Sequence, residues 1–184
     1  MNMFNEAKAA QMAAYLLSKS GGSMNYTKLM KLLYLTDRES MRLTGASMTN
    51  DQPYSLKHGP VLSLTLDLLR GKLKSQRWSG LVRTEGYDAK LARTMQEDDL
   101  DELSPFGMKI LDEVYARFGG MGWDALCRWT HDNCAEWKDP GSSRIPIAPG
   151  DVFEALGWAP EQAQQLALQY DEQRELDRTL ANLN

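Results

Sequence analysis

The sequence lacks the features that mark membrane, secreted and nucleotide-binding proteins. It has no apolar run of about eighteen residues, so no part of it is expected to span a membrane. The N-terminal stretch MNMFNEAKAA contains acidic Glu6 and no basic region before an apolar block, which is not the pattern of a signal peptide. The glycine-rich motifs of P-loops and dinucleotide-binding folds are missing, and so is G-x-S-x-G. Phosphate cradles and nucleophile elbows are therefore not expected.

Cysteine and histidine are scarce, with two residues of each. Two cysteines make no disulfide framework and fit a reducing compartment, so we expect a cytoplasmic protein. Cys127, His131 and Cys134 fall at i, i+4 and i+7, on one side of a helix, and His58 supplies a fourth potential zinc ligand. The Cys-x-x-Cys spacing of structural zinc sites is absent, and free cysteines are commonly buried. We expect no metal or cofactor, and a metal-dependent hydrolase stays open as an alternative.

The charge is divided unevenly along a chain of 184 residues whose net charge is −4. Residues 1–83 hold 12 Lys and Arg against 5 Asp and Glu, or +7, and residues 84–184 hold 9 against 20, or −11. Such asymmetry indicates either an acidic or nucleic-acid partner for the basic half, or two halves that face each other. The acidic overall pI of about 5.3 argues against a dedicated nucleic-acid domain.

Helical periodicity dominates the pattern. One helix is predicted over residues 3–19, and a second begins after Asn25, a good N-cap, and ends at Gly45. LVRT and YDAKLAR, separated by Glu85 and Gly86, predict one hairpin. The fold class is therefore α+β: a predominantly α-helical single domain with one small β-hairpin. Its expected bounds are residues 1–157, followed by a polar C-terminal helical extension over residues 158–184.

The stretch YSLKHGPVLSL places one histidine before Gly59 and Pro60. Pro60 suits the first turn of a helix, and Gly59 allows a tight bend before it, so we predict that a central apolar helix, PVLSLTLDLLR, starts here. A catalytic histidine needs a nucleophile or a substrate proton within reach, and no serine or cysteine motif accompanies His58. We therefore expect His58 to be structural.

Basic residues recur along the second predicted helix, at Lys28, Lys31, Arg38 and Arg42. Their spacing puts them near one another, and we expect them to be exposed charges. They are the only support for an alternative function, a DNA-binding transcriptional regulator. This alternative is not preferred, because an isolated basic stripe is more often a solvated helix face. The polar connection that follows, residues 46–57, is long enough to be functional.

One part of the chain resembles a known family. The run KLMKLLYL, a loop led by Gly45 that contains Tyr54, and His58-Gly59-Pro60 resemble the hallmark of the Panacea, or SocA-like, antitoxin domain, which also occurs in phage-associated GepA-like proteins. Weaker similarities follow at WTH, residues 129–131, and at Trp137. The resemblance covers residues 5–157 and is most specific in its first half.

The resemblance implies a non-enzymatic antitoxin that neutralises a cognate toxin by direct protein–protein binding. A protease-adaptor role and a homo-oligomer stay open, and neither a nucleic-acid nor a membrane partner is expected. We expect partner binding at the basic residues and the polar connection. The candidate partner-binding residues are Lys28, Lys31, Arg38, Arg42, Asp51 and Tyr54. The candidate structural residues are Tyr34, His58, Gly59, Pro60 and His131.

Overall fold

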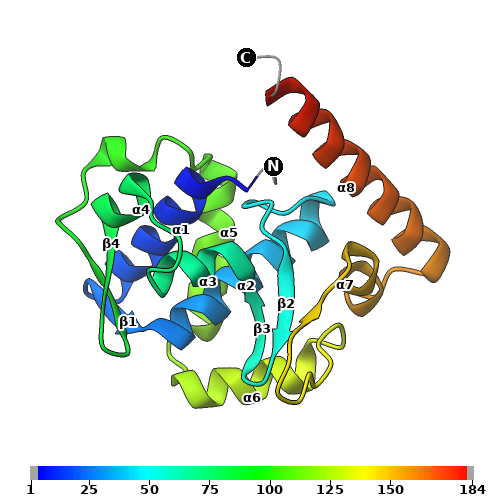
Figure 1. Cartoon of the computed structure of the whole chain (residues 1–184), viewed down its shortest axis with the longest axis horizontal. Helices are drawn as coiled ribbons and strands as arrows, with labels where there is room; N and C mark the ends of the chain where they lie inside the picture. Colours follow the sequence, from blue (N-terminus) through cyan, green and yellow to red (C-terminus); the bar gives the residue numbers. More distant parts are fainter. Residues whose placement is uncertain (1–3, 182–184) are drawn as a thin grey trace.

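The computed structural model describes residues 4–181 as a mostly helical α+β fold, as the sequence predicted (Figure 1). The helices are α1 (Glu6–Lys19), α2 (Tyr26–Thr44), α3 (Ser63–Leu69), α4 (Gln76–Leu81), α5 (Pro105–Phe118), α6 (Trp123–Asn133), α7 (Pro149–Ala155) and α8 (Pro160–Ala181), with a 3-10 turn over Glu97–Leu100. The strands are β1 (Ser23–Asn25), β2 (Pro53–Leu56), β3 (Gly59–Leu62), β4 (Val82–Glu85), β5 (Asp88–Leu91) and β6 (Ile145–Pro146).

Helix α2 passes through the middle of the molecule (Figure 1). The side chain of Asn25 accepts hydrogen bonds from the amides of Thr27 and Lys28, which fixes the first turn. Gly45 ends the helix with a φ of +75°, a conformation that glycine adopts without strain. Both predicted ends are confirmed. Between them α2 is buried on nearly every side from Leu29 to Asp37, so the rest of the fold is arranged around it.

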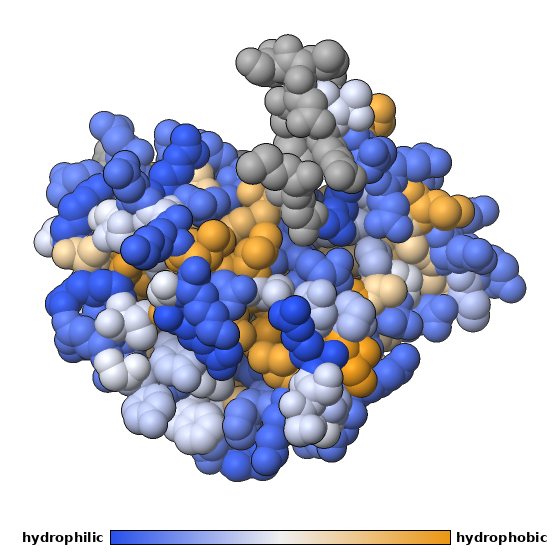
Figure 2. Space-filling model, in the orientation of Figure 1, coloured by the Kyte–Doolittle hydropathy of each residue, from blue (hydrophilic) through white to orange (hydrophobic). Residues whose placement is uncertain are grey.

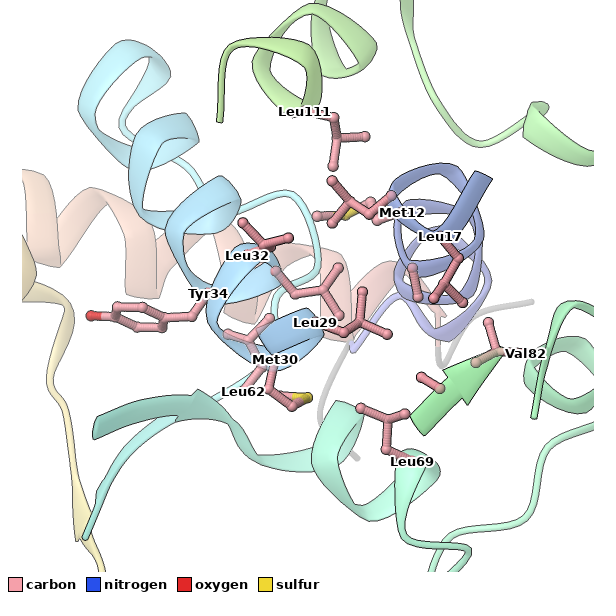
Figure 3. Packing of buried hydrophobic residues seen from close by; sticks show 14 of the residues in the cluster. Met12, Leu17, Leu29, Met30, Leu32, Tyr34, Leu62, Leu69, Val82 and Leu111 are labelled. Carbon is pink, nitrogen blue, oxygen red and sulfur yellow. The ribbon is translucent and has the colours of Figure 1, made fainter. Parts of the chain in front are cut away.

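The main core fills the space between α2 and the elements around it. In Figure 3, Leu29 and Leu32 point from α2 toward α1, where Met12 and Leu17 lie, while Tyr34 points to the other side of the helix. The side chains labelled on the first side are apolar, whereas Tyr34 on the second side ends in a phenol. Because Tyr34 is buried, its phenol needs a hydrogen-bond partner on that side of α2.

A first antiparallel sheet, of order β1-β5-β4, contains the hairpin that the sequence predicted. Gly86 and Tyr87 form its turn, and Gly86 has a φ of +60°. Strand β1 was not predicted, because three residues between two helices are too short to show an alternation. It pairs with β5 across a separation of more than sixty residues, from Ser23 to Lys90.

A second antiparallel sheet, of order β3-β2-β6, corrects the predicted start of the central helix. Gly59 and Pro60 belong to β3 and not to a helix, and α3 begins at Ser63. Pro60 is tolerated in a strand because β3 is the edge of its sheet, where a missing amide proton removes no ladder bond on the open side. The prediction of a single strand region was therefore wrong.

The last two helices form a smaller cluster beside the main core. Phe153 of α7 and Ala163 and Tyr170 of α8 are buried there against Met41 of α2. Most other described residues of α8 are exposed, and the helix runs along one flank of the molecule (Figure 1). The polar tail is helical from Pro160 to Ala181. None of the helices in the described part of the chain is long and apolar enough to cross a membrane.

Candidate functional site

The β2–β3 hairpin is anchored to α2 and α6 at its tip. Gly59 has a φ of +100°, and a Cβ atom built on it would lie 2.7 Å from Thr130 Oγ1 and 2.9 Å from Lys31 Nζ. Only glycine therefore fits here, both for its backbone conformation and for the space. Lys31 Nζ donates a 2.7 Å hydrogen bond to the carbonyl oxygen of Pro60, and both residues are buried.

The segment after α6 holds the hairpin from the other side. Trp137 Nε1 donates a 2.9 Å hydrogen bond to the carbonyl oxygen of Leu56. The ring of His131 stacks on Trp137, with centroids 3.9 Å apart and planes 13° from parallel. Ser55 Oγ accepts a 3.2 Å hydrogen bond from the amide of Lys138. The tryptophan and the histidine at the end of the family-like pattern thus support the strand that leads to His58.

The two histidines of the sequence have different environments. His58 lies in the exposed turn between β2 and β3, so its predicted position at a helix start is wrong. His131 is partly buried, and its Nε2 has no hydrogen-bond partner in the described part of the chain. Burial lowers the pKa of His131, and the nearby charge of Lys31 lowers it further. A neutral, stacked imidazole is the form that this environment favours.

A buried ion pair joins α2 to the same segment. Glu136 Oε1 accepts hydrogen bonds from Tyr34 Oη at 2.5 Å and from Arg38 Nε at 2.6 Å, and Arg38 Nη2 reaches Oε2 at 3.2 Å. Burial raises the pKa of Tyr34 well above its ordinary value, so the phenol remains a donor. The pKa of neighbouring Cys134 is raised to about 12, mainly by burial, which keeps the thiol protonated and unreactive.

Two buried carboxylates organise the polar connection after α2. Asp37 accepts hydrogen bonds from the hydroxyls of Ser47 and Thr49 and from the amide of Met48. Asp51 accepts from the amides of Leu64 and Thr65. Asp51 therefore caps α3 from a distance in the chain, which explains why the residue before that helix, Leu62, makes no side-chain cap.

The four basic residues of α2 do not form an exposed stripe. Lys31 is 1% exposed, and Arg38 is held by Glu136. Lys28 Nζ donates a 2.6 Å hydrogen bond to the carbonyl oxygen of Gly119, and exposed Arg42 pairs with Glu39. The expectation that Lys31 and Arg38 are exposed charges was therefore wrong, because α5, α6 and the segment after α6 pack on that side. Because of this burial, the four side chains do not form a row of exposed charges for phosphate contacts, on which the DNA-binding alternative depended.

The other two candidate partner-binding residues, Asp51 and Tyr54, differ in exposure. Asp51 is 1% exposed and is committed to capping α3. Tyr54 is partly exposed on β2, and the guanidinium of Arg144 lies 4.9 Å from the centre of its ring. Of the six candidates, Lys31 and Asp51 are therefore buried.

The residues weighed as zinc ligands do not come together as a site. Among residues 4–181, no group of three or more His, Cys, Asp and Glu side chains is arranged to hold a metal ion. Cys127 and Cys134 are both free and buried.

Sequence reasoning missed Glu136 and Thr130. Glu136 sits in an irregular segment with no periodicity to indicate that it is buried. Its partners on α2 precede it by 98 and 102 residues. Thr130 carried one signal, its place within the WTH stretch, but its contact with Gly59 depends on how α6 crosses the hairpin.

The chain is similar to a known protein family. A family model described as "Antitoxin SocA-like, Panacea domain" matches residues 29–138. This region begins in α2 and ends just after Trp137, so it includes the anchored hairpin and the buried ion pair. Searches of the curated proteins and of the solved structures found no match.

Proposed function

The chain belongs to the SocA-like antitoxin family with a Panacea domain, and from that membership we propose that it neutralises a cognate toxin by binding it directly. One observation carries this proposal beyond the family name. The motif residues Lys31, Gly59 and Pro60 are used to hold the β2–β3 hairpin in place, and the residues between the two strands, Lys57 and His58, face solvent. A rigidly mounted, exposed tip is a typical arrangement for recognition.

We further propose that neutralisation takes place in the cytoplasm and requires no catalysis. In this scheme residues 1–157 act as the Panacea domain and residues 158–184 as an extension. Burial of Ala163 and Tyr170 against α2 and α7 supports an extension that is attached to the domain and not separate from it.

Co-expression tests this function. The open reading frame next to this gene, the expected toxin, is expressed from an inducible promoter with and without the chain, and growth and copurification are measured. Restored growth together with a stoichiometric complex supports neutralisation by binding. Restored growth in which the toxin disappears only in the presence of an intact protease indicates an adaptor. Growth arrest that the chain does not relieve contradicts the proposal.

A further inference from the structure

A pocket of about 320 Å³ opens beside the exposed tip of the hairpin. Its walls come from the first turns of α2, from β2 and β3, from α3 and from the loop at Gly141–Ser143. Figure 2 views the face that carries the hairpin and α3, where hydrophobic residues gather near the centre and hydrophilic ones surround them. This volume is at the lower end of ligand-binding pockets and suits one or two side chains better than a large cofactor.

The charged side chains that line this pocket, among the described residues, are all basic, and they lie beside the neutral polar groups of Tyr26, Thr27, Ser142 and Ser143. Lys31 lies in its wall, and Lys57, His58 and Arg70 lie at its exposed parts. No Asp or Glu is among the lining residues in the described part of the chain. Within residues 4–181, Lys57 and Arg70 form no ion pair and no side-chain hydrogen bond. The pocket therefore presents positive charge that nothing in its wall neutralises.

Lys31 adds a buried positive charge to this pocket. Its ammonium group is buried, it has no carboxylate partner in the described residues, and its hydrogen bond there is to the neutral carbonyl of Pro60. Burial lowers its pKa to about 8. An unpaired buried charge is unfavourable, and an anion that approaches it regains interaction energy in a medium that screens poorly.

We propose that this pocket receives a carboxylate side chain of the toxin, near Lys31 and between Lys57 and Arg70. The inference rests on the proposed function and identifies its contact point. The apolar wall residues Met30, Val61 and Leu66 suit the methylene groups of Asp or Glu and an apolar neighbour. A single basic pocket does not suit a nucleic-acid backbone, whose recognition needs a row of phosphate contacts.

Charge reversal with a matched control tests the proposal. Lys57→Glu with Arg70→Glu is compared with Lys74→Glu and Arg77→Glu, which change the net charge equally at exposed residues outside the pocket. We expect both variants to melt like the wild type, because none of the four side chains is buried. The pocket variant is expected to bind toxin at least about tenfold more weakly, with a reduced salt dependence, and the control to change by less than about threefold.

The occupant is then identified by a charge swap. Single Asp→Lys and Glu→Lys variants of the toxin are titrated against the pocket variant, and one of them is expected to restore affinity. If both double variants bind alike, or if no toxin substitution restores binding, the pocket is not the receptor for a carboxylate, although the chain remains an antitoxin. A wild-type chain that binds no toxin contradicts the proposed function itself, and the pocket proposal fails with it.

Discussion

The buried amine of Lys31 and the carbonyl oxygen of Pro60 are joined by a hydrogen bond of 2.7 Å. This bond ties the central helix to the edge strand of the second sheet, directly beneath Gly59. Two separate sequence motifs, KLMKLLYL and His58-Gly59-Pro60, therefore form one structural unit.

The pH dependence of stability should reveal the burial of Lys31. The pKa of Lys31 is about 8 in the folded chain, whereas its ordinary value is 10.5. Between these two pH values the unfolded state binds more protons than the folded state, so the stability of the fold rises with pH there. Relative to Lys31→Met, the wild type should gain up to about 3 kcal/mol between pH 7 and pH 10.5. Urea denaturation of both proteins across this range measures the difference. Parallel curves would show that the amine is not buried as a charged group.

Substitution of Gly59 should be more damaging than substitution of another glycine with positive φ. Gly59→Ala adds a methyl group within 3 Å of Thr130 Oγ1 and Lys31 Nζ, whereas Gly86→Ala meets nothing within 4 Å. We expect Gly86→Ala to cost about 1 kcal/mol, the penalty of the left-handed backbone alone, and Gly59→Ala at least twice as much. Thermal denaturation compares the two. Equal losses would mean that the hairpin is not held closely against Lys31 and Thr130.

Removal of the buried ion pair should destabilise the fold more than removal of an exposed one. Glu136→Gln leaves Arg38 without its carboxylate and should cost about 2 to 4 kcal/mol, below the full penalty because Arg38 is partly exposed. Tyr34→Phe should cost about 1 kcal/mol. Arg42→Ala, which removes an exposed pair with Glu39, is the control and should cost less than about 1 kcal/mol. Chemical denaturation that ranks Arg42→Ala beside Glu136→Gln would disprove a structural role for the pair.

The two histidines should respond differently to substitution. Contrary to the expectation of a structural His58 from the sequence, His58→Gln should leave the melting temperature unchanged, because His58 is exposed in a turn. His131→Ala should lower it through the loss of stacking on Trp137, and His131→Phe should preserve it. Because the pKa of His131 is lowered on folding, its protonation also removes stability as the pH falls below about 6.5, and His131→Phe should lose that dependence. Melting curves at pH 5 and pH 7 provide the comparison; a large effect of His58→Gln would reverse the assignment.

Several elements follow from short segments of the sequence. The ends of α2 are set by Asn25 and Gly45, which act on the residues next to them. The β4–β5 hairpin needs only two short runs and the turn between them. The family resemblance is likewise read from short sequence motifs, and the match to residues 29–138 confirms it.

The tertiary structure decided the rest, because the deciding contacts join residues that are far apart in the chain. Pro60 belongs to a strand because Ser55 pairs with it, a relation that its local preference for a helix start does not contain. Lys31 is buried and Arg38 is partly buried because α6 and the segment around Glu136 pack on α2, and helical spacing fixes only that the two share a side. The sequence alone determined the family, the helical class and the ends of α2. Long-range packing determined which charges are neutralised and which, at Lys57 and Arg70, remain exposed.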